Sequence, residues 1–360
     1  MKNNNENKIL NVPNLRFPEF SGEWENCQIA NILSIGSGRD YKHLEKGNIP
    51  VFGTGGYMTS VNECIYDGET TFIGRKGSIN KPFYYNGKFW TVDTLFYTHS
   101  FNKTTPKFVY CLFQTINWLR YNEASGVPSL SKDTIEKIKV FIPQLDEQRK
   151  ISEMLSVIDE RIATQNKIIE DLKKLKSAIS LNVLHSDKWE QFKIKDIAQI
   201  GRGRVISSIE IGQQKSPTYP VYSSQTSNDG IMGYLDDYMF EGEYISWTTD
   251  GANAGTVFYR NGKFNCTNVC GLLKLRKEFD THFVSLVLAE ATKKYVSINL
   301  ANPKLMNNTM GNIQIRLPKL EEQKRISIVF RVLQRLWTVH NSLLTEYTKQ
   351  EQYLLSQMFI

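Results

Sequence analysis

Two stretches of this 360-residue chain repeat each other and decide how it folds: IPQLDEQRKISEML at residues 142–155 and LPKLEEQKRISIVF at residues 317–330. Each copy has a proline, an acidic pair and a Gln–basic–basic–Ile run that opens a long amphipathic stretch. The second copy starts 175 residues after the first (317 minus 142). Since two equivalent units in one polypeptide imply an internal two-fold axis, the repeat suggests a target made of two parts.

The repeat extends upstream of these stretches. Nearer the N-terminus the offset falls to 165, because Gly36-Ser37-Gly38-Arg39 matches Gly201-Arg202-Gly203-Arg204. Further matches at the offset of 175 are Asn86-Gly87-Lys88-Phe89 with Asn261-Gly262-Lys263-Phe264, and Pro128 and Leu130 with Pro303 and Leu305. A spacing that changes while the order is kept indicates short insertions and deletions in loops. The period is too long for a solenoid or a propeller, so we predict a tandem pair of domains.

Composition argues against several classes of protein. The polar start MKNNNENKIL is unlike a signal peptide, and no apolar run approaches the ~20 residues that span a bilayer. Five cysteines without CxxC spacing predict reduced thiols and no zinc site. The net charge of +7 permits binding to a polyanion without proving it. We therefore expect a cytoplasmic protein with no membrane contact and no bound metal.

The two amphipathic stretches carry the heptad pattern of a coiled coil. Apolar residues recur at alternating spacings of four and three, which gives a narrow seam rather than a broad globular face. No Pro or Gly follows the opening proline, so nothing interrupts either helix. The seam positions of the first copy are Ile151, Leu155, Ile158, Ile162, Gln165, Ile169, Leu172, Lys176, Ile179 and Val183, and those of the second are Ile326, Phe330, Leu333, Trp337, His340, Leu344, Tyr347, Glu351, Leu354 and Met358.

Polar residues fall at matching places in the two seams, Gln165 with His340 and Lys176 with Glu351. A polar seam position usually fixes the register of a coiled coil, and we assign His340 this role rather than a catalytic one. A two-fold axis perpendicular to the rod requires the helices to pair antiparallel. It also sends the two globular domains to opposite ends of a rod of roughly 55 Å, at 1.5 Å per residue.

The globular segments hold most of the glycines and aromatics, in short β-leaning runs such as 70–73, 81–85, 243–247 and 256–259. Brief helical patterns cover 107–119 and 282–291. Asn86-Gly87 and Asn261-Gly262 lie between apolar runs and carry the signal of a type I′ hairpin turn. Each globular segment is therefore predicted to be a mixed α/β domain.

The predicted fold class is α+β. Two mixed α/β domains are separated by two long α-helices, which form an intramolecular antiparallel coiled coil with internal pseudo-two-fold symmetry. The predicted boundaries are 1–143 for the first domain, 144–185 for the central helix, 186–318 for the second domain and 319–360 for the C-terminal helix.

The loops between matched flanks differ. Residues 74–81 (GRKGSINK) are basic, whereas residues 248–255 (TTDGANAG) are rich in amides and hydroxyls. FGTGGYMTS follows Pro50-Val51, and YSSQTSNDG follows Pro220-Val221. Two similar scaffolds with differently equipped loops suit the reading of two different half-sites, although neutral drift of surface loops predicts the same pattern.

Sequence patterns of enzymes are missing. We find no Asn/Asp-Pro-Pro-Tyr methyltransferase motif and no Walker lysine loop, and the Gly-x-Gly-Arg turns are too short for a dinucleotide fingerprint. The nearest set for a nuclease, Asp133 with Glu136 and Lys137, is more simply a solvated helix or strand edge. Five scattered histidines support no Ser–His–Asp arrangement. The chain is predicted to be non-catalytic.

The repeated P-x-L-[DE]-E-Q-[RK]-[KR]-I opening, its heptad helix and the variable domain before each copy resemble the specificity subunit of type I restriction–modification systems. The stretch NVPNLRFPEFSGEW at residues 11–24 is also similar to that family. The resemblance covers essentially the whole chain. It implies two target-recognition domains that each read half of a split double-stranded DNA sequence, while the helices act as a ruler.

The resemblance also implies partners. Two adenine methyltransferase subunits carrying S-adenosylmethionine would dock on the helices, and restriction/translocase subunits using ATP and Mg would join them. No cofactor is expected in this chain itself.

We predict DNA contacts from residue type and place. Arg39, Arg202 and Arg204 lie in glycine-rich turns, where a guanidinium and free amides can reach phosphate. Arg75 and Lys76 can bond guanine, and Asn253 can bond adenine. Further candidates are Asn80, Lys81, Gln225, Asn228 and Thr249. For each residue the alternative is an ordinary solvent-facing loop position.

Two other functions fit the same residues. One is a non-catalytic coiled-coil scaffold with two ligand-binding modules for carbohydrate or protein. The other is an RNA-binding adaptor. Salt-sensitive binding to duplex DNA, and co-purification with a methyltransferase, would separate DNA recognition from both.

Overall fold

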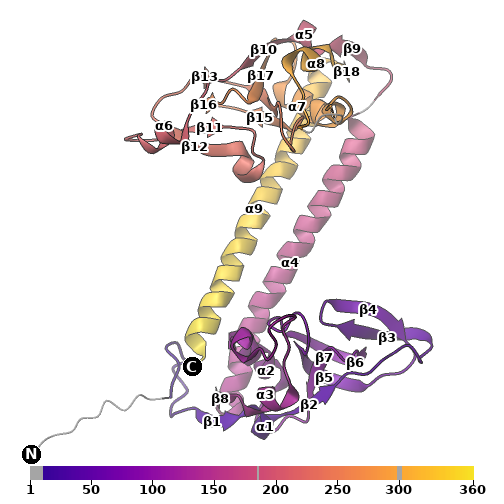
Figure 1. The fold of residues 1–360 in the computed structure, drawn as a ribbon, viewed down its shortest axis with the longest axis vertical. Coiled ribbons are helices and arrows are strands. Elements are labelled where there is room, and N and C mark those ends of the chain that lie inside the picture. Colours follow the sequence, from indigo (N-terminus) through magenta and orange to yellow (C-terminus); the bar gives the residue numbers. More distant parts are fainter. Residues whose placement is uncertain (1–10, 185, 298–301) are drawn as a thin grey trace, which may run out of the picture. The chain divides into compact units, whose positions relative to one another are not determined.

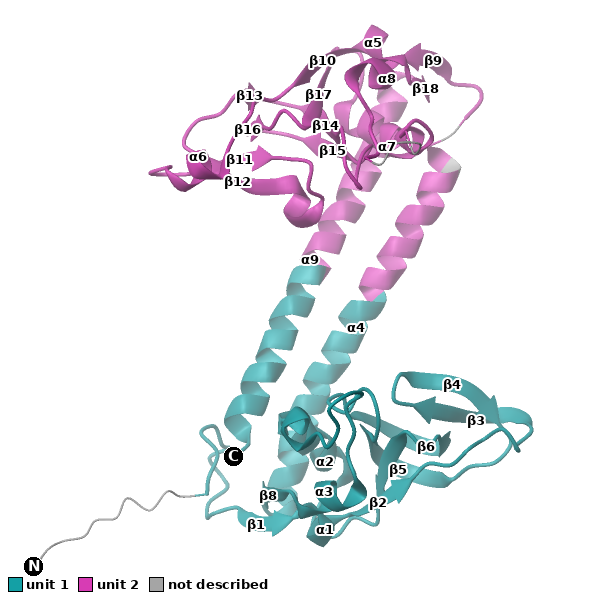
Figure 2. Cartoon of the chain, in the orientation of Figure 1, with its two compact units in different colours: residues 1–167, 341–360 teal, residues 168–340 magenta. Residues whose placement is uncertain are grey.

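The computed structural model describes residues 11–184, 186–297 and 302–360. The polar start at residues 1–10 and the predicted domain boundary at residue 185 lie outside the described residues. The chain divides into two compact units (Figure 2): unit 1 comprises residues 1–167 and 341–360, and unit 2 comprises residues 168–340. Each unit combines a globular α/β part with segments of two long helices, α4 (Leu145–Val183) and α9 (Leu320–Met358) (Figure 1). None of the described helices has both the length and the apolarity to cross a bilayer.

Unit 1 is built around a six-stranded sheet. Its strand order is β2 (Ser34–Ser37), β7 (Leu95–His99), β5 (Tyr66–Gly74), β6 (Phe83–Thr91), β3 (Lys46–Gly53) and β4 (Gly56–Val61). All neighbours are antiparallel except β3 and β6, which are parallel. A second sheet pairs β1 (Glu25–Gln28) with β8 (Lys139–Ile142). The shorter helices are α1 (Ile29–Ile32), α2 (Pro106–Thr115), η1 (Trp118–Tyr121) and α3 (Lys132–Lys137).

Unit 2 divides the corresponding strands between two four-stranded sheets. The first has the order β10 (Ala198–Arg202), β17 (Cys270–Leu275), β14 (Tyr244–Thr248) and β15 (Val257–Arg260). The second has the order β12 (Ile231–Leu235), β11 (Tyr219–Tyr222), β16 (Lys263–Cys266) and β13 (Phe240–Glu241), and a small sheet pairs β9 (Glu190–Lys193) with β18 (Gln314–Leu317). Its shorter helices are α5 (Ile194–Ile197), α6 (Ser208–Gly212), η2 (Ser227–Gly230), α7 (Thr281–Ala291), η3 (Thr292–Lys294) and α8 (Asn307–Asn312).

A tryptophan packs against the core of each unit, buried in unit 1 and half-buried in unit 2. In unit 1 the Trp24 ring packs edge-on against Phe108 of α2, 6.2 Å between centroids, and against Phe359, 6.1 Å away. In unit 2, Trp189 packs against Phe283 of α7 at 5.8 Å. Phe359 follows α9 and lies in the core of unit 1, so the end of this helix completes a hydrophobic core beside α2.

The glutamine of the repeated motif joins α4 to the globular part of unit 1. Gln148 is fully buried at the start of α4. Its Oε1 accepts hydrogen bonds from Thr104 Oγ1 (3.0 Å) and Thr105 N (3.1 Å). Its Nε2 donates to the carbonyls of Lys103 (2.9 Å) and Pro143 (2.8 Å). One amide therefore satisfies four polar groups at the base of the helix.

Gln323 makes the equivalent bridge in unit 2. Its Oε1 accepts from Asp280 N (3.0 Å), and its Nε2 donates to the carbonyl of Pro318 (2.8 Å). Asp280 caps α7, as Thr105 caps α2, by accepting a hydrogen bond from the third helical amide. The motif is repeated because each globular part is attached to its long helix by the same bridge.

The long helices pair antiparallel within each unit. In unit 1, Asp159 of α4 contacts Glu351 of α9, and the Arg161 guanidinium lies 5.7 Å from the ring centroid of Tyr347. In unit 2, Lys176 Nζ donates to Gln334 Oε1 at 3.3 Å. Partner numbers on α9 fall as those on α4 rise, which confirms the predicted antiparallel coiled coil.

The seam prediction is confirmed for most positions. Ile151, Leu155 and Leu354 are buried, whereas Lys176 and Trp337 are exposed. Burial raises the pKa of Glu351 to about 7, together with a hydrogen bond that its protonated carboxyl donates to Asp159 and the negative charge of Asp159.

The predicted hairpin turns at the two Asn-Gly pairs are wrong. Asn86-Gly87 lies inside β6, where it pairs with Gly68 and Glu69 of β5. Asn261-Gly262 joins β15 to β16, which belong to different sheets. Both glycines have positive φ, so the local backbone preference that the sequence indicates is present. The pairing of the flanking strands, however, places neither Asn-Gly pair in a hairpin. The predicted helices over 107–119 and 282–291 and the four predicted strand runs are present, with small shifts at their ends.

Replacing Gln148 by Ala should lower the free energy of unfolding by about 1–3 kcal/mol. The reason is that the substitution leaves the Thr104 hydroxyl and backbone groups around it buried without partners. Thermal and urea unfolding followed by circular dichroism would measure the change. Gln144→Ala, four residues earlier and exposed, is the matched control and should be near neutral. Equal effects of the two substitutions would contradict the bridge.

Candidate nucleic-acid interface

Three loops of unit 1 meet at the turn 91–95 between β6 and β7. The Gly-x-Gly-Arg turn is tied there by Arg39 N, which donates to the Thr91 carbonyl at 2.8 Å. The loop after β5 is tied by Arg75 N, which donates to the Thr94 carbonyl at 2.8 Å. The loop after β3 is held where the Phe52 carbonyl accepts from Val92 N at 3.1 Å. We call these converging loops the three-loop surface.

Unit 2 repeats the three-loop surface at the turn 266–270. Arg204 N donates to the Cys266 carbonyl (3.1 Å), and Thr249 N donates to the Val269 carbonyl (3.1 Å). The Tyr222 carbonyl accepts from Thr267 N (2.9 Å). The hydrogen bonds match residue for residue, so the two surfaces are equivalent.

The matched Pro-x-Leu segments brace the middle loop in both units. In unit 1, Gly77 N donates to the Pro128 carbonyl (2.8 Å) and Leu130 N to the Arg75 carbonyl (2.9 Å). The bonds from Gly251 to Pro303 (3.0 Å) and from Leu305 to Thr249 (2.8 Å) are their equivalents. Residues 74–81 and 248–255 are thus the same loop in two chemical versions, as the sequence predicted.

The second glycine of each Gly-x-Gly-Arg turn is required by close packing. A Cβ atom on Gly38 would overlap the carbonyl oxygens of Thr91 and Val92. One on Gly203 would overlap the carbonyl of Cys266. Glycine therefore lets each Gly-x-Gly-Arg turn pack directly on the turn that joins the two strands, 91–95 in unit 1 and 266–270 in unit 2. The arginine that follows the glycine lies at the edge of this contact.

Unit 1 brings the predicted basic residues together on its three-loop surface. Arg39, Lys76 and Lys81 are exposed. Arg75 is also exposed, with its guanidinium 6.0 Å from the Phe96 ring centroid and Nη1 donating to the Asp93 carbonyl at 3.2 Å. Asn80 lies exposed in the same loop.

A pair of exposed apolar residues beside this loop was missed at the sequence level. Tyr57 and Met58 lie exposed in β4, just after the tip of the β3–β4 hairpin. Thr54 of that tip is close enough to touch a side chain placed on Gly77. The GTGGYM composition marks a hairpin tip but does not say which loop it adjoins, so only the fold reveals the contact.

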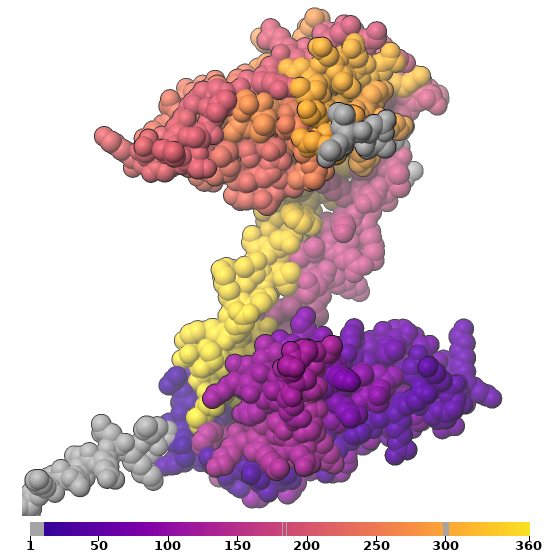
Figure 3. Space-filling model, in the orientation of Figure 1, coloured from indigo at the N-terminus to yellow at the C-terminus, as the bar shows by residue number. Residues whose placement is uncertain are grey.

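The predicted arginines of unit 2 are engaged by neighbours. Arg202 Nε donates to Asn307 Oδ1 at 2.9 Å. Arg204 forms a two-point ion pair with Glu210 of α6 and donates to the Val205 carbonyl. Both remain exposed, and the charge of Arg204 is compensated by Glu210. Around α6, unit 2 has a protruding edge (Figure 3).

The remaining unit 2 candidates fall into two groups. Asn228 and Asn253 are exposed, as base contact requires. Thr249 is only 2% exposed and donates its hydroxyl to the Val269 carbonyl at 2.9 Å, so its predicted role in base readout is not supported. Gln225 is half-buried and donates its amide to the Ile231 carbonyl, so it braces its own loop.

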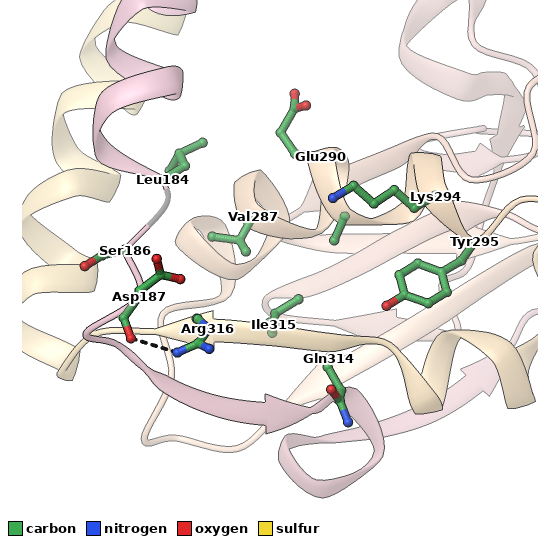
Figure 4. Close-up of a pocket in the computed structure, with 11 residues that line it drawn as sticks. Leu184, Ser186, Asp187, Val287, Glu290, Lys294, Tyr295, Gln314, Ile315 and Arg316 are labelled. Atoms are coloured by element: carbon green, nitrogen blue, oxygen red, sulfur yellow. Dashed lines mark hydrogen bonds between the residues drawn. The ribbon is translucent and has the colours of Figure 1, made fainter.

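A hollow among the described residues of unit 2 has a volume of about 400 Å³. It lies beside α7 and β18, where Arg316 Nη1 donates to the Asp187 carbonyl at 2.8 Å (Figure 4). Its polar lining residues, including Glu290 and Lys294, form no set of nucleophile, base and orienting group (Figure 4). Within residues 11–184, 186–297 and 302–360, no three His, Cys, Asp or Glu side chains are grouped to hold a metal.

Two conspicuous titratable sites also have structural explanations. His282 lies on α7, and burial followed by the charge of Arg331 lowers the pKa of His282 to about 4. The neutral ring bonds Ser327 of α9 through Nδ1 at 2.9 Å and so links α7 to the long helix. Asp133 lies in the exposed first turn of α3, which agrees with a solvated helix surface.

Comparisons with known proteins agree with this arrangement. The type I restriction modification DNA specificity domain family matches twice, over residues 21–174 and 186–347. A protein of Mycoplasma pneumoniae named as a type I specificity subunit is 34% identical over 226 residues, or 60% of this chain and 82% of the relative. The specificity subunit of the type I restriction enzyme MpnII, from the same organism, is 42% identical over 149 residues, covering 41% of this chain and 44% of the relative.

The fold has a solved counterpart. The crystal structure of a type I restriction–modification S subunit from M. genitalium has a TM-score of 0.79 and 16% identity, and covers 97% of this chain and 99% of that one. A TM-score of this size over nearly the whole of both chains shows that the two proteins share a fold.

The duplicated DNA-recognition domains on a pair of long helices define a class of non-catalytic DNA-binding subunits. This chain belongs to the family of type I restriction–modification DNA specificity subunits. That membership decides against a carbohydrate- or protein-binding scaffold and against an RNA adaptor.

Replacing Gly203 by Ala should destabilise unit 2 by roughly 1–3 kcal/mol or more, because the new methyl group overlaps a backbone carbonyl that cannot move independently. Thermal unfolding and limited proteolysis of the 198–275 region would report the loss. Gly201→Ala is the matched control, since nothing lies within 4 Å of its Cβ position. If both variants unfold like the unmodified chain, close packing is not the reason for the second glycine.

Proposed function

We propose that each unit reads one half of a bipartite, asymmetric DNA sequence through its three-loop surface. The observation that carries this proposal is the pairing of one backbone frame with two chemically different loops. The frame is tied by the same hydrogen bonds in both units. The loop after β5 presents Arg75 and Lys76, whereas its equivalent after β14 presents Asn253 among small and hydroxyl residues.

The chemistry of the loops supports different base preferences. Arginine and lysine donate to the O6 and N7 acceptors of guanine, whereas asparagine can form two hydrogen bonds with adenine. Arg39 and Arg202, in the turns beside these loops, suit phosphate contacts that position the duplex. We infer that the half-site read by unit 1 contains guanine and that the two halves differ in sequence.

The long helices support a fixed separation between the half-sites. Each is 39 residues long, about 58 Å at 1.5 Å per residue. A turn of DNA is ~34 Å, so we propose half-sites about one turn apart with an unread spacer between them. Each half should contain an adenine that a partner flips out of the duplex and methylates.

An apolar stripe on α9 supports docking of an adenine methyltransferase subunit. Its exposed residues follow helical spacing: Ile328, Val332, Leu336, Val339 and Leu343. The equivalent positions on α4 hold Glu153, Val157, Arg161, Thr164 and Ile168. An exposed apolar face of this kind is typical of a surface that a partner covers.

We infer the remaining partners from the family. Two methyltransferase subunits carrying S-adenosylmethionine would supply the modification chemistry, and restriction/translocase subunits using ATP and Mg would supply cleavage. The complex would act in the cytoplasm, where the chromosome lies, without membrane contact.

Co-expression with a cognate modification subunit, followed by genome-wide mapping of methylated adenines, tests the proposal. The expected result is one motif with two unlike halves and a constant unread gap. A continuous or palindromic methylated motif would contradict reading by two dissimilar units.

Replacing Arg75 by Ala should relax base preference in one half-site and leave the other unchanged. One good base contact supplies roughly 1–3 kcal/mol of discrimination, so a loss of about tenfold or more is expected at one base pair. The same adenine mapping measures it. Lys139→Ala, which removes one charge from β8 in the separate β1–β8 sheet, is the control. Uniform weakening on all DNA would make Arg75 a phosphate contact instead.

Replacing Leu336 by Asp should reduce co-purification of the methyltransferase subunit about tenfold or more. A fully buried leucine contributes about 1.5–3 kcal/mol, and a buried carboxylate opposes docking further. Quantitative pull-down with the tagged chain measures the loss. Thr345→Asp, exposed on a different face of α9 by its helical spacing, is the control. Undiminished binding by the Leu336 variant would remove this stripe from the interface.

A further inference from the structure

A buried arginine lies under a recognition loop of unit 2. Arg260 ends β15 and is only 2% exposed, although arginine is almost never buried unless it is paired. Its guanidinium carbon lies 3.6 Å from the Tyr222 ring centroid and 4.4 Å from that of Phe258. Its Nε donates to Ser246 Oγ at 3.0 Å. The group is therefore held by the Tyr222 ring of β11, the Phe258 ring of its own strand β15 and the Ser246 hydroxyl of β14.

The remaining contact of Arg260 reaches the loop of residues 223–230, between β11 and β12. Nη1 donates to Asp229 Oδ2 at 3.0 Å, in an ion pair whose aspartate is 71% exposed. A Cβ atom on Gly230 would lie 3.0 Å from Nη2, so the guanidinium also packs directly beneath the loop backbone. Arg260 is therefore the buried partner of this ion pair, and Asp229 is the exposed partner. We call Arg260 the anchor of the loop.

The 223–230 loop needs such an anchor because its backbone is unusual. Asn228, Asp229 and Gly230 have φ values of 48°, 52° and 80°, three consecutive left-handed residues. Such residues normally occur singly, since the conformation costs energy for any residue but glycine. Ser223 N donates to the Gly230 carbonyl at 2.9 Å and closes the loop. The ion pair ties Asp229, the middle of the three left-handed residues, to the interior.

The anchor is specific to unit 2. The position equivalent to Arg260 in unit 1 is Tyr85, whose ring lies 4.9 Å from Phe52. Phe52 is in turn the equivalent of Tyr222, since Val51 pairs with Trp90 as Val221 pairs with Asn265. An aromatic pair in unit 1 is replaced by a cation stacked on an aromatic ring in unit 2, where the loop above is longer and left-handed.

We propose that Arg260 is a positioning residue for base recognition by unit 2. It holds the 223–230 loop in its left-handed form through Asp229 and so fixes the exposed Asn228, whose Nδ2 also donates to the Ile231 carbonyl at 3.4 Å, against one base pair. The inference rests on the proposed reading of one half-site by each unit.

The test maps methylated adenines for the full chain co-expressed with its modification subunit. Arg260→Met keeps the volume but removes the charge and the donors, and should cost about tenfold or more in discrimination within one half-site, with the other half and the gap unchanged. Arg260→Lys should recover only part of it, because an ammonium cannot serve Ser246 and Asp229 as a planar fork does. Lys263→Met, an exposed charge lost from the adjacent strand β16, is the control.

Asp229→Ala separates positioning from folding, because its exposed side chain can be removed without opening the interior. It should relax the same base pairs as Arg260→Met. An unchanged motif in Arg260→Met, or loss of all methylation in Arg260→Met together with an unchanged motif in Asp229→Ala, would overturn the inference. A chain without mutations that yields no two-part motif would instead contradict the proposed function itself.

Discussion

The amide side chain of one repeated glutamine holds each globular part to its long helix. Gln148 and Gln323 each accept from the segment that caps a neighbouring helix and donate to the proline carbonyl just before the long helix. Because both amide ends are occupied and buried, the angle at which the helix leaves the domain is fixed twice by the same chemistry. In each unit the globular part is therefore joined to its long helix by a buried amide that is hydrogen-bonded at both ends.

The three-loop surfaces of the two units have parts that are the same and parts that differ. The turns 91–95 and 266–270 hold their three loops by matching backbone hydrogen bonds, which carry no sequence information. Side chains on those loops differ: unit 1 exposes Arg75 and Lys76, and unit 2 ties Arg204 to Glu210. Because these bonds join backbone atoms, side chains of the loops other than the packed glycines can differ without loss of the frame. The Arg260 anchor shows that the interior beneath a loop changes with it.

Several predictions from the sequence agree with the structure because they rest on periodic or repeated patterns. The heptads predicted two long helices, and α4 and α9 span 39 residues each. The matched Gly-x-Gly-Arg and Pro-x-Leu segments predicted equivalent loops, which the hydrogen bonds confirm. The Asn-Gly turns failed because a residue pair records local backbone preference only, while pairing along the whole of β5 and β6 decided that residues 86 and 87 stay within a strand.

By itself the sequence determined the duplication, the antiparallel helix pair and the family, since each follows from residue spacings and repeated motifs that need no coordinates. Only the tertiary structure decided which loop residues are exposed. Thr249 and Asn253 stand four residues apart in one loop, yet the first is buried against Val269 and the second is exposed. In the sequence, Arg260 is an ordinary charged residue at the end of a predicted strand. The structure brings Tyr222, Ser246 and Asp229, which are distant in sequence, around its side chain. Burial and partnership are properties of long-range packing, and composition and spacing do not record them.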